Sequence, residues 1–295
     1  MRIRIAHRTH YRFDRPVRLA PHEIRLRPAP HSRTPTTAYA LAIGPARHRL
    51  HWQHDSAGNQ VARVVFQETA SELTIDVGFE ADLTPFNPFD FLIDPRAEHL
   101  PVDYLLETAN LTPYLQATEQ GPRLLEWLRT FEVQQPENAP TIDTLTRLNQ
   151  QVAATIQYLV RHDPGVQSCE ATLAAASGSC RDSGWLLVQA LRHCGIAARF
   201  VSGYLVQLAG ITHATAEKIA DEKDRVDLHA WAEAYLPGAG WLGFDATSGL
   251  LAAEGHVPLA VSATHEGAAP VSGSVEPSAV ELEFDMKLTR LDVRS

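Results

Sequence analysis

The apolar residues of this chain change their spacing near residue 100, and this change limits the folds that the chain can adopt. Before it, apolar and polar residues alternate in short runs such as Arg2–Ile5 and Leu73–Phe79. Alternation of this kind is typical of strands that bury one face. Turn-forming segments such as Asp55–Asn59 separate the runs. Short strands at this spacing predict an all-β sandwich or barrel.

Beyond residue 100, the apolar residues recur every three to four positions, as on the buried side of a helix. One such stripe consists of Leu145, Leu148, Val152, Ile156 and Leu159. The turn Asp163–Gly165 follows it, and we therefore expect this helix to continue as far as Leu159. A second helix is predicted to begin at Cys180, with Gly195 as its C-terminal cap.

Strand-like runs return after the second helix. They are Ala198–Leu205, Ala230–Leu236, Trp241–Phe244 and the tail Val280–Leu288. The tail is expected to be a long, half-buried strand that could pair with either sheet. The polar segment 207–227 is expected to be a mobile insertion near the functional site. The proline-rich stretch Thr84–Pro95 marks a connection before the helices. We predict an α+β protein with a β-rich N-terminal domain over residues 1–98 and a core over residues 99–295 that ends in a C-terminal strand.

The composition argues against several classes of function. The chain of 295 residues has a net charge of −9, which argues against a nucleic-acid partner. No run approaches the roughly 18 apolar residues of a membrane span. The start, Met1–Arg8, lacks the apolar core of a signal peptide. We therefore expect a cytoplasmic protein that has no membrane partner.

The chain has three cysteines, Cys169, Cys180 and Cys194. An odd number in a chain without an export signal indicates reduced thiols rather than disulfides. Their spacing is wider than that of the paired ligands of a structural zinc site, and the fourteen histidines form no His-x-x-x-His pair on a predicted helix. We predict neither a metal nor a cofactor.

Cys180 differs from the other two cysteines in its position. It lies in the run Gly178–Ser183, where a Gly/Ser turn leads directly into an amphipathic helix. A helix N-terminus favours the thiolate form of a cysteine, so Cys180 is the candidate nucleophile. Cys194 falls on the apolar face of the helix, and Cys169 is also expected to be a packing residue. A serine nucleophile is disfavoured, because the run does not match the Gly-x-Ser-x-Gly elbow.

His229 and Asp245 follow Cys180 in the order that a nucleophilic cysteine site requires. His229 lies in Asp227–Trp231, and Asp245 lies in Trp241–Thr247. Alone, each has an ordinary structural interpretation, as a core histidine or a turn aspartate. A tight Pro-Gly turn joins the two strands, so the two side chains can approach each other while the cysteine helix packs across them. The imidazole then takes the thiol proton, and the carboxylate orients the imidazole.

Three further residues are assigned to substrate binding or to support of these catalytic groups. Trp231 lies two residues after His229 and therefore shares its face of the strand. Asp182 lies in the first turn of the cysteine helix, where negative charge is favoured. Tyr204 lies in the strand that follows this helix.

The chain resembles the bacterial transglutaminase-like superfamily. The motifs that carry the likeness are Gly178–Asp182, Ala198–Tyr204, Leu228–Glu233 and Gly243–Thr247, with His7–Tyr11 and Asp55–Asn59 in the N-terminal region. The likeness implies a papain-like α+β core in which Cys180 is the nucleophile, His229 the general acid and base, and Asp245 the orienting carboxylate. The chain departs from the commoner pattern at Ala246, where many members have proline, and at Ser183, where many have a bulkier residue.

The resemblance implies thiol chemistry through a thioester, with a peptide or protein as the substrate. We expect hydrolysis of a peptide-like amide without a cofactor. Two alternatives stay open. One is acyl transfer from the thioester to an amine, and the other is a non-catalytic binding module on the same fold. The sequence contains no calcium loop of the Asp-x-Asp-x-Asp-Gly type.

Overall fold

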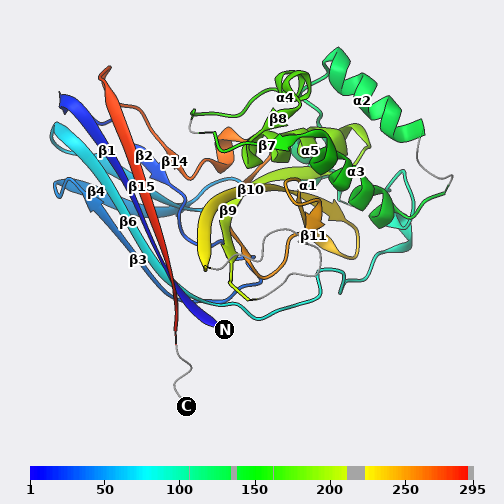
Figure 1. The fold of residues 1–295 in the computed structure, drawn as a ribbon, viewed down its shortest axis with the longest axis horizontal. Coiled ribbons are helices and arrows are strands. Elements are labelled where there is room, and N and C mark those ends of the chain that lie inside the picture. The colour runs from blue at the N-terminus through cyan, green and yellow to red at the C-terminus, as the bar shows by residue number, and fades with distance from the viewer. Residues whose placement is uncertain (106, 134–137, 162, 211–222, 292–295) are drawn as a thin grey trace.

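The computed structural model describes residues 1–105, 107–133, 138–161, 163–210 and 223–291. Figure 1 shows the long strands of the N-terminal region gathered on one side of the molecule and the helices on the other. Residues 211–222 of the expected insertion lie outside the described residues, whereas its two ends belong to strands of the core. No helix in the described part of the chain is long and apolar enough to cross a membrane.

The N-terminal region consists of two antiparallel sheets. One has the strand order β15-β1-β6-β3 and the other the order β14-β2-β5-β4. Their bounds are β1 Arg2–Val17, β2 His22–Ile24, β3 Thr36–Gly44, β4 His48–His54, β5 Gln60–Phe66, β6 Ala70–Asp82, β14 Val271–Ser272 and β15 Val280–Arg290. Inward residues of both sheets, among them Ile5, Ile24, Val64 and Phe79, share one apolar cluster. The alternation in the sequence therefore predicted the β-rich region correctly.

The core is a five-stranded antiparallel sheet covered by helices. Its strand order is β12-β11-β10-β9-β13. The strands are β9 Ala198–Gln207, β10 Arg225–Leu236, β11 Gly240–Asp245, β12 Leu250–Leu251 and β13 His256–Ser262. The helices are α1 Thr108–Leu115, α2 Pro122–Val133, α3 Thr141–Thr155, α4 Cys169–Ala175 and α5 Cys180–His193, with short turns η1 Pro95–Ala97 and η2 Glu266–Ala268. The predicted α+β class, with a papain-like core behind an all-β region, is confirmed.

Helix α5 lies at the centre of the core. Almost all of its residues are buried, and Leu187, Val188 and Leu191 join the apolar cluster between the helices and the sheet. Gly184 lies next to the backbone of β10, since a β-carbon built there would be in ordinary van der Waals contact with the Trp231 backbone nitrogen, 3.5 Å away.

Helix α3 ends four residues earlier than its apolar stripe predicted. It stops at Thr155, and the chain continues as the short strand β7, Gln157–Tyr158, which pairs in parallel with β8, Ser177–Gly178. The amide of Leu159 donates to the Gly178 carbonyl at 2.8 Å. Pairing with the segment that precedes Cys180 therefore replaced the last helical turn, and Leu159 is partly exposed.

The C-terminal strand is present as predicted, but it lies in the N-terminal sheet. Strand β15 runs antiparallel to β1, and Figure 1 shows the two side by side. Strand β14 likewise extends the second sheet through β2. Residues 271–290 therefore complete the sheets of the N-terminal region rather than those of the core.

A buried asparagine connects the N-terminal region to the edge of the core sheet. The Asn59 side-chain amide donates to the Val261 carbonyl, and its oxygen accepts from the Val261 amide, both at 2.8 Å. Asp55 holds this amide from the other side, with its carboxylate 2.9 Å from Asn59 Nδ2. The Asp55–Asn59 turn thus supplies strand β13 with the two hydrogen bonds that a neighbouring strand would provide.

We expect Asn59→Asp to destabilise the protein by about 1–3 kcal/mol, because a buried carbonyl loses its donor and a carboxylate takes its place. The free energy of unfolding from denaturant titration measures the effect. Asn87→Asp is the matched control, since Asn87 is exposed and its side chain acts only as an acceptor toward Phe89. Equal stability of the two variants would contradict the bridging role of Asn59.

Candidate active site

Asp182 fixes the turn that leads into helix α5. Its carboxylate is fully buried and accepts from the backbone amide and the hydroxyl of Ser179, each at 2.8 Å. It also accepts from the Gln167 amide at 2.7 Å and from the Arg161 guanidinium at 3.1 Å. Burial opposes its ionisation, but these donors outweigh burial and lower its pKa. Asp182 therefore determines where the first residue of the helix, Cys180, is placed.

Cys180 and His229 meet where the start of α5 crosses β10. Both side chains are nearly buried, and Cys180 lies close enough to His229 to raise the pKa of its imidazole. His229 Nε2 lies 3.1 Å from Asp245 Oδ1, so its other ring nitrogen, Nδ1, is the one available to the thiol. The structure thus brings the three sequence-predicted catalytic residues together, from α5, β10 and the end of β11.

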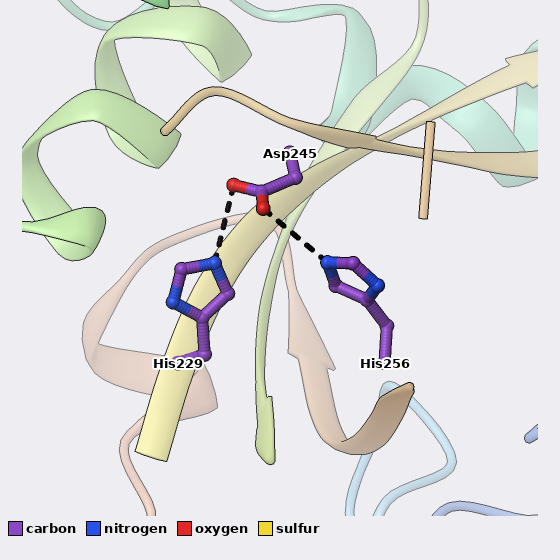
Figure 2. A group of neighbouring side chains, drawn as sticks. All are labelled: His229, Asp245 and His256. Carbon is purple, nitrogen blue, oxygen red and sulfur yellow. Dashed lines mark hydrogen bonds and ion pairs between the residues drawn. The ribbon is translucent and has the colours of Figure 1, made fainter. Parts of the chain in front are cut away.

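The Asp245 carboxylate is 2% exposed and surrounded by hydrogen-bond donors. Besides His229, Oδ1 accepts from the Thr247 amide at 2.9 Å and the Thr247 hydroxyl at 2.7 Å. Oδ2 accepts from the Ser248 hydroxyl at 3.0 Å and lies 3.3 Å from His256 Nε2. Figure 2 shows the two imidazoles approaching the two carboxylate oxygens from different sides. These donors hold the carboxylate in one orientation.

His256, at the start of β13, is a member of this site that the sequence did not reveal. Its Nδ1 accepts from the Ala253 amide at 3.2 Å, so in the neutral ring the proton is on Nε2. Nε2 then donates to Asp245. The residue is 11 positions from Asp245 along the chain, and only the pairing of β13 with β9 brings it near. No spacing rule could have identified it.

His229, Asp245 and His256 have side chains of the types that bind metals, and their ligand atoms lie within 4.8 Å of one another. A metal ligand must offer an unprotonated nitrogen, however. The Ala253 amide fixes the His256 proton on the nitrogen that faces Asp245. The cluster is therefore better suited to hydrogen bonding than to metal coordination.

His229 and Asp245 each stabilise the charged form of the other. Burial opposes protonation of His229, but the Asp245 carboxylate and Cys180 outweigh burial and raise its pKa to about 10. Burial likewise opposes ionisation of Asp245, yet the two imidazoles hold its pKa well below the usual range. The arrangement favours an imidazolium between a carboxylate and a sulfur, the charge pattern that activates a cysteine.

Trp231 supports both imidazoles. Its buried ring stacks on His229 with centroids 6.3 Å apart, and meets His256 edge-on with centroids 5.3 Å apart. Gly203 on the neighbouring strand leaves the space for this ring, because a β-carbon there would collide with it. Trp231 is thus 1% exposed and packs against both imidazoles.

Tyr204 lies apart from the other predicted site residues. Its hydroxyl lies 2.7 Å from His7 Nδ1, inside the apolar cluster shared with the N-terminal sheets. Burial raises the pKa of Tyr204 and lowers that of His7 to about 4, so both groups stay neutral at pH 7. The structure therefore places Tyr204 in the contact between the two regions.

Tyr158 is a further residue that the sequence pattern missed. It was expected to lie within a helix, yet it lies in β7 beside Gly178. Burial and the negative charges of Cys180, Asp227 and Asp245 raise the pKa of its phenol. Tyr158 is half exposed and lies close enough to Cys180 for the charge of the sulfur to act on its phenol.

Comparison with known proteins agrees with this geometry. Residues 3–82 match the family model of the bacterial transglutaminase-like N-terminal region, and residues 129–246 match that of the transglutaminase-like superfamily. The chain combines a bacterial transglutaminase-like N-terminal region with a transglutaminase-like core. The expected family resemblance is therefore confirmed, and the core match contains Cys180, His229 and Asp245.

Other proteins share the architecture of this transglutaminase-like chain over nearly its whole length. The crystal structure of the "putative cysteine protease" of Cytophaga hutchinsonii aligns with a TM-score of 0.70, covering 100% of this chain and 92% of that chain at 17% identity. Uncharacterised proteins of Mycobacterium tuberculosis and Mycobacterium bovis are each 25% identical over 308 residues, covering 97% of this chain and 92% of the relative. The match to the solved structure shows a common fold.

We expect the His229 side chain to remain an imidazolium at pH 8, because its raised pKa keeps the proton bound well above the usual range. Asp245→Asn should lower this pKa, since it removes the partner charge. Ring ¹⁵N chemical shifts across a pH titration measure both, and loss of the signal in His229→Gln assigns it. A neutral His229 ring at pH 8 in the native protein would rule out the charge arrangement.

We expect His256→Ala to destabilise the protein at pH 7 by about 1.5–3 kcal/mol, because a buried carboxylate loses a donor. His256→Gln retains an N–H donor and should recover part of the loss. Denaturant unfolding measures both variants. The control is His51→Ala on an exposed position of β4, expected to change stability by less than about 0.5 kcal/mol. A His256→Ala effect as small as the control's would show that Asp245 does not depend on this donor.

Proposed function

We propose that this chain hydrolyses a peptide-like amide through a thioester on Cys180. The observation that carries the proposal is the buried His229–Asp245 pair, joined at 3.1 Å, beside Cys180, because Asp245 and Cys180 both raise the pKa of the imidazole that lies between them. The same order of groups performs acyl transfer on several unrelated folds, which shows that the geometry rather than the fold supplies the chemistry.

In the acylation step, the Cys180 thiolate adds to the amide carbon, and the carbonyl π electrons move to oxygen. As the tetrahedral intermediate collapses, the C–N bond breaks, and the His229 imidazolium donates its proton to the departing nitrogen. Asp245 keeps the imidazole directed at the reacting atoms throughout. The products of this step are a free amine and a thioester between Cys180 and the acyl group.

In the second step, water attacks the thioester carbon while neutral His229 takes its proton. The C–S bond then breaks, which releases a carboxylic acid and restores the thiolate–imidazolium pair. An amine in place of water would give a new amide by the same route. Hydrolysis and acyl transfer therefore differ only in the attacking molecule.

The backbone N–H of Cys180 is suited to stabilise the oxyanion of each intermediate. Cys180 is the first residue of α5, where no preceding helical turn supplies an acceptor carbonyl. The positive end of the helix dipole adds to this effect. Asp182 contributes by holding the turn before the nucleophile, so that the N–H points in a fixed direction.

We expect Cys180→Ala to lower amide turnover by about 10⁴-fold or more, because no other group can form the thioester. Incubation of casein with the protein and a biotinylated alkylamine, followed by mass spectrometry, measures new peptide termini and labelled side chains separately. New termini support hydrolysis, whereas labelled glutamines support transfer. If neither product depends on Cys180, the fold acts as a binding module and the proposal fails.

Selective alkylation provides a second test that needs no substrate. We expect iodoacetamide at pH 7 to modify Cys180 far faster than Cys169 and Cys194, as peptide mapping would show. Burial raises the pKa of Cys169, and it raises that of Cys194 to about 12, so both stay protonated. The two are internal controls, and equal modification of all three thiols would contradict an activated Cys180.

A further inference from the structure

We propose that the exposed segment Tyr158–Val160, which we name the apolar ledge, binds an apolar group of the substrate next to the amide that Cys180 attacks. The inference rests on the proposed function and narrows its substrate to amides flanked by an apolar side chain.

The apolar ledge passes directly alongside the start of helix α5. Tyr158 is opposite Gly178 in the parallel pair β7–β8, and Gly178 is two residues before the nucleophile. The Leu159 amide continues the contact by donating to the Gly178 carbonyl at 2.8 Å. A molecule bound at Cys180 would therefore have this segment as one of its walls.

The backbone of the apolar ledge is held at both ends. On one side, the Gln157 amide donates to the Ala176 carbonyl at 2.9 Å. On the other, the Arg181 guanidinium donates to the Arg161 carbonyl at 3.0 Å, while the Arg161 side chain is bound to the buried Asp182. The ledge is thus anchored to the same residues that position Cys180, and its shape is preformed.

The three side chains of the apolar ledge are unusually open to solvent for apolar residues on a fixed backbone. Tyr158 is 51% exposed, Leu159 44% and Val160 71%. Contiguous exposed apolar side chains mark places where a partner or ligand binds. The triad already fills the polar side of the site, and substrate pockets combine a few polar groups with mostly apolar walls. The bound substrate is therefore the occupant that this position favours.

The exposure of these side chains could also mean only that the protein has apolar residues on its surface without a role at the site. That explanation fits other exposed apolar residues better. Val280, Leu282 and Phe284 are also exposed, but they lie on β15 in the N-terminal sheet and not beside the nucleophile. Tyr158, by contrast, is close enough to Cys180 and Asp245 for their charges to act on its phenol. Proximity to the reacting groups distinguishes the apolar ledge from those residues.

Alkylation of Cys180 by matched reagents tests the inference. The probes are N-phenethyl iodoacetamide and a polar iodoacetamide of similar length that carries a hydroxyethoxyethyl arm. Rate constants come from peptide mapping by mass spectrometry and are divided by those for glutathione. We expect the native protein to prefer the phenethyl reagent by about tenfold, as partial burial of one aromatic ring would give. The single variants Val160→Ser and Tyr158→Ser should each bring the ratio of the phenethyl rate to the polar-reagent rate close to one.

Val133→Ser is the matched control, because Val133 is 87% exposed at the end of α2, and it should keep the full preference. Rapid modification of Cys180 without any preference in the native protein, or full preference in Val160→Ser, would overturn the apolar ledge and leave the proposed function standing. Slow modification of Cys180 by every reagent would instead contradict the proposed function.

Discussion

The buried carboxylate of Asp245 determines the geometry of the candidate site, because each side chain that contacts it donates a hydrogen bond. A carboxylate without donors would be too costly to bury in its ionised form. Here two imidazoles, two hydroxyls and a backbone amide share its two oxygens. The charge therefore stays in place, and it stabilises the His229 imidazolium that faces Cys180. We therefore expect the removal of a single donor to disturb His229 indirectly, through the carboxylate.

A second buried carboxylate positions the turn that leads to Cys180. Asp182 binds the Ser179 turn, the backbone amide of Gln167 and the Arg161 side chain, all of which precede helix α5 in the chain. The two aspartates thus hold the two halves of the site independently, one on the helix and one on the sheet. The packing of α5 on β10 then brings Cys180 next to His229.

The sequence predicted the parts of this arrangement that depend on local pattern. The start of α5, its C-terminal glycine and the order of helix and strands follow from periodicity and capping, and Cys180, His229 and Asp245 from their places in those elements. His256 could not be predicted, because its role follows from strand pairing and from one backbone amide. Tyr158 was missed for a different reason. Its apolar neighbours continue the stripe of helix α3 in the sequence, but the pairing of β7 with β8 ends the helix before it reaches them.

The N-terminal region reaches the site through strand β13. Asn59 binds Val261 near one end of this strand, and His256 begins the other end. In the same turn, Ala57 packs against the cluster that contains Trp231, the ring in contact with both imidazoles. The Asp55–Asn59 turn therefore supports the two residues that hold His229 and Asp245 from behind. The β-rich region accordingly contributes to the packing around His229 and Asp245, and a core separated from it would leave the edge of β13 and one side of Trp231 without these partners.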